Sequence, residues 1–339
     1  MPVPSDAMCK TGSPMLKELL SRHHPRRLGR KLRKSIDKRL GKMQAKEVAA
    51  MQRELSLRVS AVEQSFDQRL SAVEQRFNQR LSATDGQLLL VEQHHTSAFW
   101  HVLDKIYDHT LADKALSCVI CGHSGQRSDF EVHVTDCWLG GRKLERYECP
   151  TCECIFGAQK FLDLDDALVG LEYRLLYTRI REQDYTKEEV RTFRSLNPKN
   201  GSAYVNWGCG AWNQTVALMR EEGWNFWGYD PSAPLNAPFV VREKAQLPEG
   251  LAGLMSNNVI EHFLDPVAQF REFHDVLPPG GRMAHSTPCY DFRYANTRFH
   301  VVFLVGKSPE ILAERTGFKV VDRIRDGEYI NYVFEKCAV

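Results

Sequence analysis

The sequence predicts an α/β fold for the C-terminal half of the chain, preceded by a small cysteine-rich module and a long helix. From Ser202 onward, short apolar runs alternate with helical stretches, as strands and helices do in β-α-β order. Six of the ten cysteines lie between Cys118 and Cys154. An eleven-residue repeat within residues 47–92 spaces apolar residues along one helical stripe.

The composition excludes several classes of protein. Hydrophobic residues make up 43% of the chain and charged residues 26%, which argues against wholesale disorder and against a fibrous protein. No run of about 20 apolar residues is present, so we expect no membrane span. The first twenty residues lack the apolar core of a secretory signal. We therefore expect a cytoplasmic protein of at least two domains.

Residues 1–46 form a basic head. They hold thirteen Lys or Arg and three Asp or Glu, a net charge of +10, which leaves −8 on the rest of the chain because the total is +2. Leu28, Leu32, Ile36 and Leu40 recur every four residues among the basic ones, as in a helix that lies on an anionic membrane. A solvated, disordered tail is the alternative. Nucleic acid is disfavoured because no aromatic residues interleave the charges.

Residues 47–92 are predicted to form a coiled coil. The segment Arg58–Gln68 is repeated as Arg69–Gln79, and a third copy starts at Arg80. The apolar spacing of 3, 4 and 4 gives about 3.67 residues per turn, so the stripe stays nearly straight or drifts right-handed. A second copy of the chain is the expected partner, and packing against the protein's own body is the alternative. Asp85-Gly86 is expected to end the repeat, with a helical connector over 93–117.

Residues 118–156 are predicted to be a zinc ribbon. Two Cys-x-x-Cys pairs are separated by 27 residues, and this spacing lets four thiolates reach one tetrahedral ion. A site closed by four thiolates has no open position, so the zinc is expected to be structural. Cys154 could replace one ligand, and Cys137 and His123 are weaker candidates. The predicted zinc ligands are Cys118, Cys121, Cys149 and Cys152.

A glycine turn and an acid suggest a nucleoside pocket in the α/β domain. A strand from Ala203 enters the turn Gly208-Cys-Gly210, and a helix follows from Gln214. The next strand ends at Asp230, 20 residues after Gly210, where an acid commonly binds ribose hydroxyls. Trp212 occupies the place of the third glycine of a dinucleotide motif, which favours a ligand with a nucleoside but no phosphate at the helix.

Four motifs in order resemble the class I S-adenosylmethionine-dependent methyltransferases. They are Val205-Asn-Trp-Gly-Cys-Gly, Gly228-Tyr-Asp-Pro-Ser, Ser256-Asn-Asn-Val-Ile-Glu-His and Leu277-Pro-Pro-Gly-Gly. The resemblance implies that residues 157–339 form a Rossmann-like, seven-stranded methyltransferase domain. With the cysteine pairs ahead of it, the chain is similar to zinc-ribbon methyltransferases that act on sugars in surface-polysaccharide or glycoside pathways.

The resemblance also implies roles for individual residues. Gly208 and Gly210 would flank the methionine part of S-adenosylmethionine, and Asp230 would hold its ribose. Asn257 and Asn258 would line the pocket near the methyl group.

Two positions depart from the family pattern. Asn206 stands where the family usually has an acid, and Trp212 stands where a glycine is frequent. Loss of the acid removes one hydrogen-bond acceptor for the cofactor's amino group. Trp212 could either cover the pocket or block it.

Methylation of a hydroxyl benefits from a general base. His262 is the first candidate because it follows a strand at its carboxyl end, and His300 and His285 are the next. Each of these histidines could instead be structural. Glu261 could orient His262. Tyr173 and Tyr177 could close over the cofactor or simply belong to the core.

The sequence thus predicts an S-adenosylmethionine-dependent methyltransferase that O-methylates a sugar or glycan-linked acceptor and oligomerises through residues 47–92. The basic head could hold it at the inner membrane face. C-methylation of a nucleotide sugar is one alternative. The other is a non-catalytic scaffold with the methyltransferase fold.

Overall fold

The computed structural model describes residues 30, 45–110, 114–140, 142–179, 183–210, 214–233 and 236–338. Most of the basic head and Trp212 therefore lie outside the described residues. The chain divides into two compact units, Met1–Glu92 and Gln93–Val339. Within the described residues, no helix combines the length and the apolar character needed to cross a membrane.

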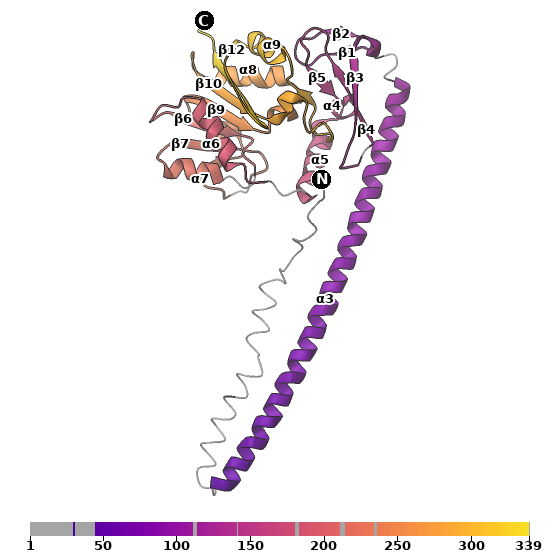
Figure 1. Ribbon diagram of the computed structural model, residues 1–339, viewed down its shortest axis with the longest axis vertical. Helices are drawn as coiled ribbons and strands as arrows, with labels where there is room; N and C mark the ends of the chain where they lie inside the picture. Colours follow the sequence, from indigo (N-terminus) through magenta and orange to yellow (C-terminus); the bar gives the residue numbers. More distant parts are fainter. Residues whose placement is uncertain are drawn as a thin grey trace. The chain divides into compact units, whose positions relative to one another are not determined.

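A single helix, α3, extends over Ala45–Thr110 (Figure 1). The predicted turn at Asp85-Gly86 does not form, and the predicted connector is the continuation of this helix as far as Thr110. A Cβ on Gly86 would meet nothing within 4 Å, so the glycine lies in open space. One exposed glycine costs a helix only about 1 kcal/mol, too little to interrupt a long run of good helix formers.

The cysteine-rich region folds as two small antiparallel sheets. One pairs β1 with β2, and the other has four strands in the order β11-β5-β4-β3. The strands β3 and β4, called the ribbon strands below, lie between the two cysteine pairs and pair antiparallel over their full lengths. The fourth strand, β11, comes from far along the sequence and pairs with β5. The bounds are β1 Leu116–Ser117, β2 Ser124–Gly125, β3 Glu131–Asp136, β4 Lys143–Glu148, β5 Ile155–Gly157 and β11 Val302–Phe303.

The predicted seven-stranded sheet is confirmed, with the order β12-β13-β10-β9-β6-β7-β8. The strands β10, β9, β6, β7 and β8 are parallel neighbours, whereas β13 is antiparallel to both β10 and β12. The bounds are β6 Ala203–Trp207, β7 Asn225–Tyr229, β8 Val240–Val241, β9 Leu251–Asn257, β10 Arg282–Ser286, β12 Phe318–Asp326 and β13 Tyr329–Lys336.

Helices cover both faces of this sheet (Figure 1). Phe193 of α6 and Met219 of α7 pack with Met255 and Ala284 on one face. Phe270 of α8 and Leu312 of α9 belong to the larger core on the other face. The helices are α4 Gln159–Leu162, α5 Asp166–Arg179, α6 Thr186–Ser195, α7 Gln214–Glu221, α8 Pro266–Val276 and α9 Ser308–Arg315, and the 3₁₀ helices are η1 Arg127–Asp129, η2 Lys244–Gln246, η3 Ile260–His262 and η4 Pro288–Asp291.

Candidate functional site

The glycine turn after β6 is shaped by its contacts with two neighbouring segments. Gly208 and Gly210 have φ angles of 71° and 74°, which favour glycine. A Cβ on Gly208 would lie 2.7 Å from Cγ2 of Val259, so only glycine lets the loop after β9 approach the turn. The Gly208 amide donates to the carbonyl of Tyr229, 2.7 Å away, and this bond ties the turn to the end of β7.

Asp230 lies beside this turn, as the sequence spacing predicts. Its Oδ2 accepts a hydrogen bond from the Gly210 amide at 2.9 Å, and its Oδ1 accepts one from the Ser232 amide at 2.7 Å. The carboxylate is only partly buried. Because an ionised carboxylate has about four acceptor positions, Asp230 can still accept hydroxyl hydrogens from a ligand at this edge of the sheet.

Two asparagines leave polar atoms unpaired at the same edge. Within the described residues, neither Nδ2 nor Oδ1 of Asn206 has a hydrogen-bond partner, although the residue is fully buried. Asn257 accepts from the Ser286 hydroxyl through Oδ1 at 2.8 Å, while its buried Nδ2 is unpaired. Buried polar groups are nearly always hydrogen-bonded, so these atoms suit a polar ligand. Asn258 follows with a φ of 55°, and its amide donates to the Ser286 carbonyl.

His262, the last residue of η3, contacts His300. Their ring centroids are 4.9 Å apart and the rings are nearly perpendicular. Nδ1 of His262 lies 3.0 Å from the carbonyl oxygen of Phe299, and Nδ1 of His300 lies 2.9 Å from that of Tyr294. A carbonyl can only accept, so each contact places the ring hydrogen on Nδ1. In the neutral form of a ring with its hydrogen on Nδ1, Nε2 carries the lone pair.

Burial and a neighbouring carboxylate shape the electrostatic environment of the His262–His300 pair. Burial lowers the pKa of His300 well below its ordinary value, and the neighbouring His262 lowers it further. Glu261 is buried, and its Oε1 accepts from the Thr287 hydroxyl at 2.8 Å, but its Oε2 has no partner among the described residues. One ligand atom from each of Glu261, His262 and His300 lies within 4.8 Å of the others, a grouping that could also hold a cation.

His285 is separate from this pair, and its prediction as a base is corrected. It points from β10 toward α8, where its ring lies 5.4 Å from that of Phe270 and 5.6 Å from that of Phe273. Its Nδ1 bonds the Ser256 hydroxyl at 2.8 Å, and the side chain is fully buried. Burial lowers the pKa of His285 to about 3. A core position leaves it no access to a substrate.

Of the two tyrosines that could close over the cofactor, Tyr173 contacts the histidine pair. The hydroxyl of Tyr173 lies 3.1 Å from Nδ1 of His262, and burial raises the pKa of this tyrosine. The rings of Tyr173 and Tyr177 are stacked with centroids 6.4 Å apart. Their spacing of four residues on α5 places them on one helical face.

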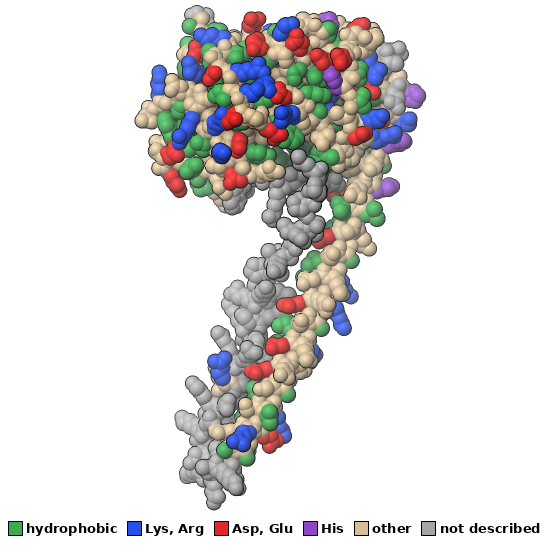
Figure 2. All heavy atoms as spheres, in the orientation of Figure 1, with side chains coloured by type: hydrophobic (Ala, Val, Ile, Leu, Met, Phe, Trp, Pro, Cys, Tyr) green, Lys and Arg blue, Asp and Glu red, His purple; other side chains and the backbone are tan. Residues whose placement is uncertain are grey.

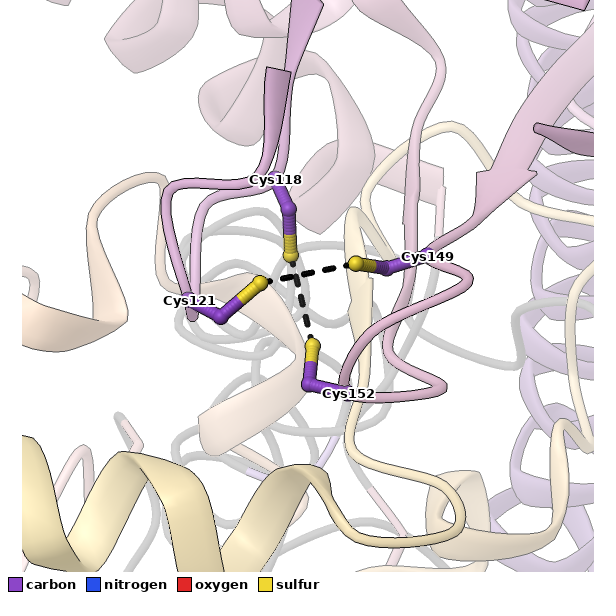
Figure 3. Close-up of side chains that lie close together, drawn as sticks. All are labelled: Cys118, Cys121, Cys149 and Cys152. Carbon is purple, nitrogen blue, oxygen red and sulfur yellow. Dashed lines mark hydrogen bonds between the residues drawn. The ribbon is translucent and has the colours of Figure 1, made fainter. Parts of the chain in front are cut away.

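The four predicted zinc ligands converge (Figure 3). The sulfurs of Cys118 and Cys152 are 3.5 Å apart, as are those of Cys121 and Cys149. Four sulfurs at about 2.3 Å from a tetrahedral zinc would be about 3.8 Å from one another, so the cluster fits this ion. The Ile120 and His123 amides donate to the Cys118 and Cys121 sulfurs, an arrangement that stabilises thiolates.

The weaker metal candidates lie outside this group of four. Cys154 is fully buried next to it, and burial raises the pKa of its thiol well above the ordinary value. The Cys137 sulfur instead faces the Arg298 guanidinium at 3.8 Å. The His123 ring packs against Phe130. Of the described cysteines, none is in a disulfide.

A separate cavity of about 600 Å³ lies between the end of α3 and the ribbon strands. Its charged side chains pair with one another: Lys160 with Asp104 at 2.5 Å, and Arg127 with Glu145 at 2.9 Å. It contains none of the predicted site residues.

A family comparison identifies the α/β region. Residues 177–322 match the family model described as a methyltransferase domain, and this span contains all four motifs quoted above. The chain therefore contains a methyltransferase domain. Residues 1–176 lie outside the match, so the repeat helix and the cysteine cluster carry no family assignment. A comparison with curated proteins gives no match.

Solved structures give low similarities to this methyltransferase domain. An S-adenosylmethionine-dependent methyltransferase from Mesorhizobium loti is 17% identical over 44% of this chain and 98% of its own, with a TM-score of 0.35. CalO1, a methyltransferase in calicheamicin biosynthesis, is 14% identical over 54% and 61%, with a TM-score of 0.37. TnmH is 14% identical over 40% of this chain and only 49% of its own, with a TM-score of 0.34. At these values, none of them bears on the substrate.

Proposed function

We propose that the chain transfers a methyl group from S-adenosylmethionine to an oxygen of a sugar or glycan-linked acceptor. The observation that carries the proposal is the glycine turn bonded to Asp230 at the carboxyl end of the sheet, inside the region that matches the methyltransferase family. Gly208 and Gly210 let the cofactor approach the backbone, and Asp230 accepts hydrogen bonds from the ribose hydroxyls of the cofactor. Asn206, Asn257 and Asn258 supply further polar contacts.

The histidine pair supports methylation of a hydroxyl. When bound, S-adenosylmethionine supplies a methyl group on a positively charged sulfur. His262 holds its hydrogen on Nδ1 against Phe299, so its Nε2 is free to accept the proton of an acceptor hydroxyl. His300, neutral because burial lowers its pKa, supplies a second acceptor nitrogen for a polyhydroxylated substrate.

Two other functions use the same domain. C-methylation of a nucleotide sugar needs the same methyl donor and differs only in the acceptor atom. A scaffold without catalysis would be favoured if Trp212 blocked the pocket. Measuring S-adenosylmethionine binding separates the scaffold from both enzymes.

The Asp230→Ala substitution is expected to weaken S-adenosylmethionine binding by about ten-fold or more, because hydrogen bonds to a charged group contribute about 1.5–3 kcal/mol each. Titration calorimetry on the purified chain measures this. Asp275→Ala removes a carboxylate that is 84% exposed on α8, and it is the matched control. If a folded wild-type chain does not bind, the scaffold is favoured. If Asp230→Ala binds normally, the ribose assignment is wrong.

We further propose that a four-thiolate zinc site stabilises the ribbon strands and that α3 joins two or more copies of the chain. Figure 2 shows hydrophobic side chains recurring along the helix among charged and polar ones. Val62, Val73, Phe77, Leu81 and Leu88 are between 46% and 63% exposed. A second copy offers a stripe of the same period and length, which makes it the best-matched partner.

Changing Val73 and Phe77 to Glu is expected to dissociate this oligomer, because two charges would be buried in the helix interface. Sedimentation of the full chain should then give the mass of a monomer. Gln68→Glu with Gln79→Glu adds the same charge at polar positions of the repeat and should leave the mass unchanged. A monomeric wild-type chain would contradict self-association.

The basic head remains a candidate for an anionic membrane surface, because its +10 charge is concentrated in 46 residues.

A further inference from the structure

Arg146 is a fully buried cation in β4 whose hydrogen bonds converge on one distant segment. Its Nη1 donates to the carbonyl of Ala295 at 2.7 Å and to the Thr135 hydroxyl at 3.0 Å. Its Nη2 donates to the carbonyls of Thr297 at 2.7 Å and His300 at 3.0 Å, and Nε donates to His300 at 3.2 Å. Three backbone carbonyls of residues 295–300 therefore share one guanidinium.

This arrangement is unusual for a buried arginine, because no carboxylate among the described residues forms an ion pair with Arg146. A buried charge without a counter-ion is costly unless its donors are well bonded. Burial lowers the pKa of Arg146 to about 10, in line with this cost. The planar guanidinium fixes the directions of its donors, so it fixes the carbonyls that accept from them.

The segment 295–300, which Arg146 holds in this way, contains His300 and contacts His262. The Phe299 carbonyl, between two carbonyls bound by Arg146, holds Nδ1 of His262. The residue after His300 bonds to both sides. The Val301 amide donates to the Glu261 carbonyl at 2.9 Å, and the Val301 carbonyl accepts from the Gly157 amide of β5 at 3.0 Å. The backbone of residues 295–301 thus lies between the ribbon strands and η3, with the imidazoles on its η3 side.

We infer that Arg146 is a positioning residue that holds His300 and His262 in the geometry needed for methyl transfer. This inference rests on the proposed function for the role of the two histidines. It gives the four-stranded sheet a role in the proposed reaction, because Arg146 belongs to β4 of that sheet, which leads into Cys149 of the thiolate cluster. The cysteine module then contributes to catalysis without contacting the cofactor.

The test compares Arg146→Met, which keeps volume but removes all donors, with Arg146→Lys, which keeps one charged donor. Arg127→Met is the matched control, since Arg127 forms only an exposed ion pair near the same sheet. We expect Arg146→Met to lower kcat by about 10- to 100-fold, because a misplacement of about 1 Å can cost 10²-fold. Affinity for S-adenosylmethionine should stay within about two-fold, and Arg146→Lys should recover part of the kcat.

A second measurement reads the histidines directly and does not need an acceptor. Imidazole Cε1–H NMR signals of His300 and His262 should shift in Arg146→Met, whereas the signal of His285, packed under α8, should not. Thr135→Val removes one hydrogen-bond partner of Arg146 without removing the charge, and it is the milder variant if Arg146→Met does not fold. It should shift the same two signals by less.

The outcomes separate the two proposals. A kcat within two-fold of wild type for folded Arg146→Met, or unchanged signals for His300 and His262, would overturn the positioning role. A wild-type chain that binds S-adenosylmethionine but methylates none of the acceptors tried would count against the proposed function alone. In that case the NMR signals still decide whether Arg146 positions the pair.

Discussion

The His262→Ala substitution is expected to lower kcat by about 10² to 10⁴, the usual contribution of a general base. Binding of S-adenosylmethionine should change little, because the ring does not belong to the Gly208–Asp230 turn that holds the cofactor in this proposal. Steady-state kinetics at saturating acceptor, together with titration calorimetry, measures the two effects separately.

His94→Ala is the matched control, because it removes an exposed ring of α3 and should leave kcat unchanged. Added imidazole should restore part of the activity of His262→Ala if the ring acts as a base. Full turnover by His262→Ala at saturating acceptor would remove His262 from the mechanism, and His300 would become the candidate base.

Loss of the thiolate cluster should destabilise the ribbon strands and abolish methyl transfer. Structural zinc sites can contribute about 10 kcal/mol or more to the folding of small domains, so Cys149→Ser should lower the Tm by roughly 10 °C or more. Metal analysis should give one zinc per wild-type chain and none for Cys149→Ser.

Cys337→Ser is the control, because Cys337 is a free thiol outside the cluster and its loss should leave the zinc content at one. A wild-type chain that is folded and free of zinc would rule out the site. A second equivalent of metal, lost in His262→Ala, would instead assign a cation to Glu261, His262 and His300.

Parts of this structure with strong local patterns could be predicted from the sequence. The strand before Gly208, the acid at Asp230 and the paired cysteines follow from residue types at fixed spacings, and such spacings determine backbone geometry directly. The ribbon strands β3 and β4 are close in sequence, and their pairing needs only a short connection.

Features that depend on register or on distant contacts could not be predicted. His285 and Ser286 are adjacent in β10, but successive strand residues face opposite sides, so His285 enters the core while Ser286 faces α6. The pairing of β11 with β5 joins segments about 145 residues apart, and a strand of two residues gives no local signal. In the sequence, Arg146 looks like an ordinary polar strand residue, because the three carbonyls that accept from it belong to the distant residues 295–300.

The pairing of β5 with β11 also has a consequence for synthesis of the chain on the ribosome. At roughly 5–20 residues per second, about 7–30 s pass between completion of β5 and the appearance of its partner strand. During that interval, the buried edge Ile155-Phe156-Gly157 exposes unpaired backbone groups, which other nascent chains can bind. The wait for residues 302–303 is therefore a step at which this protein is exposed to misassembly.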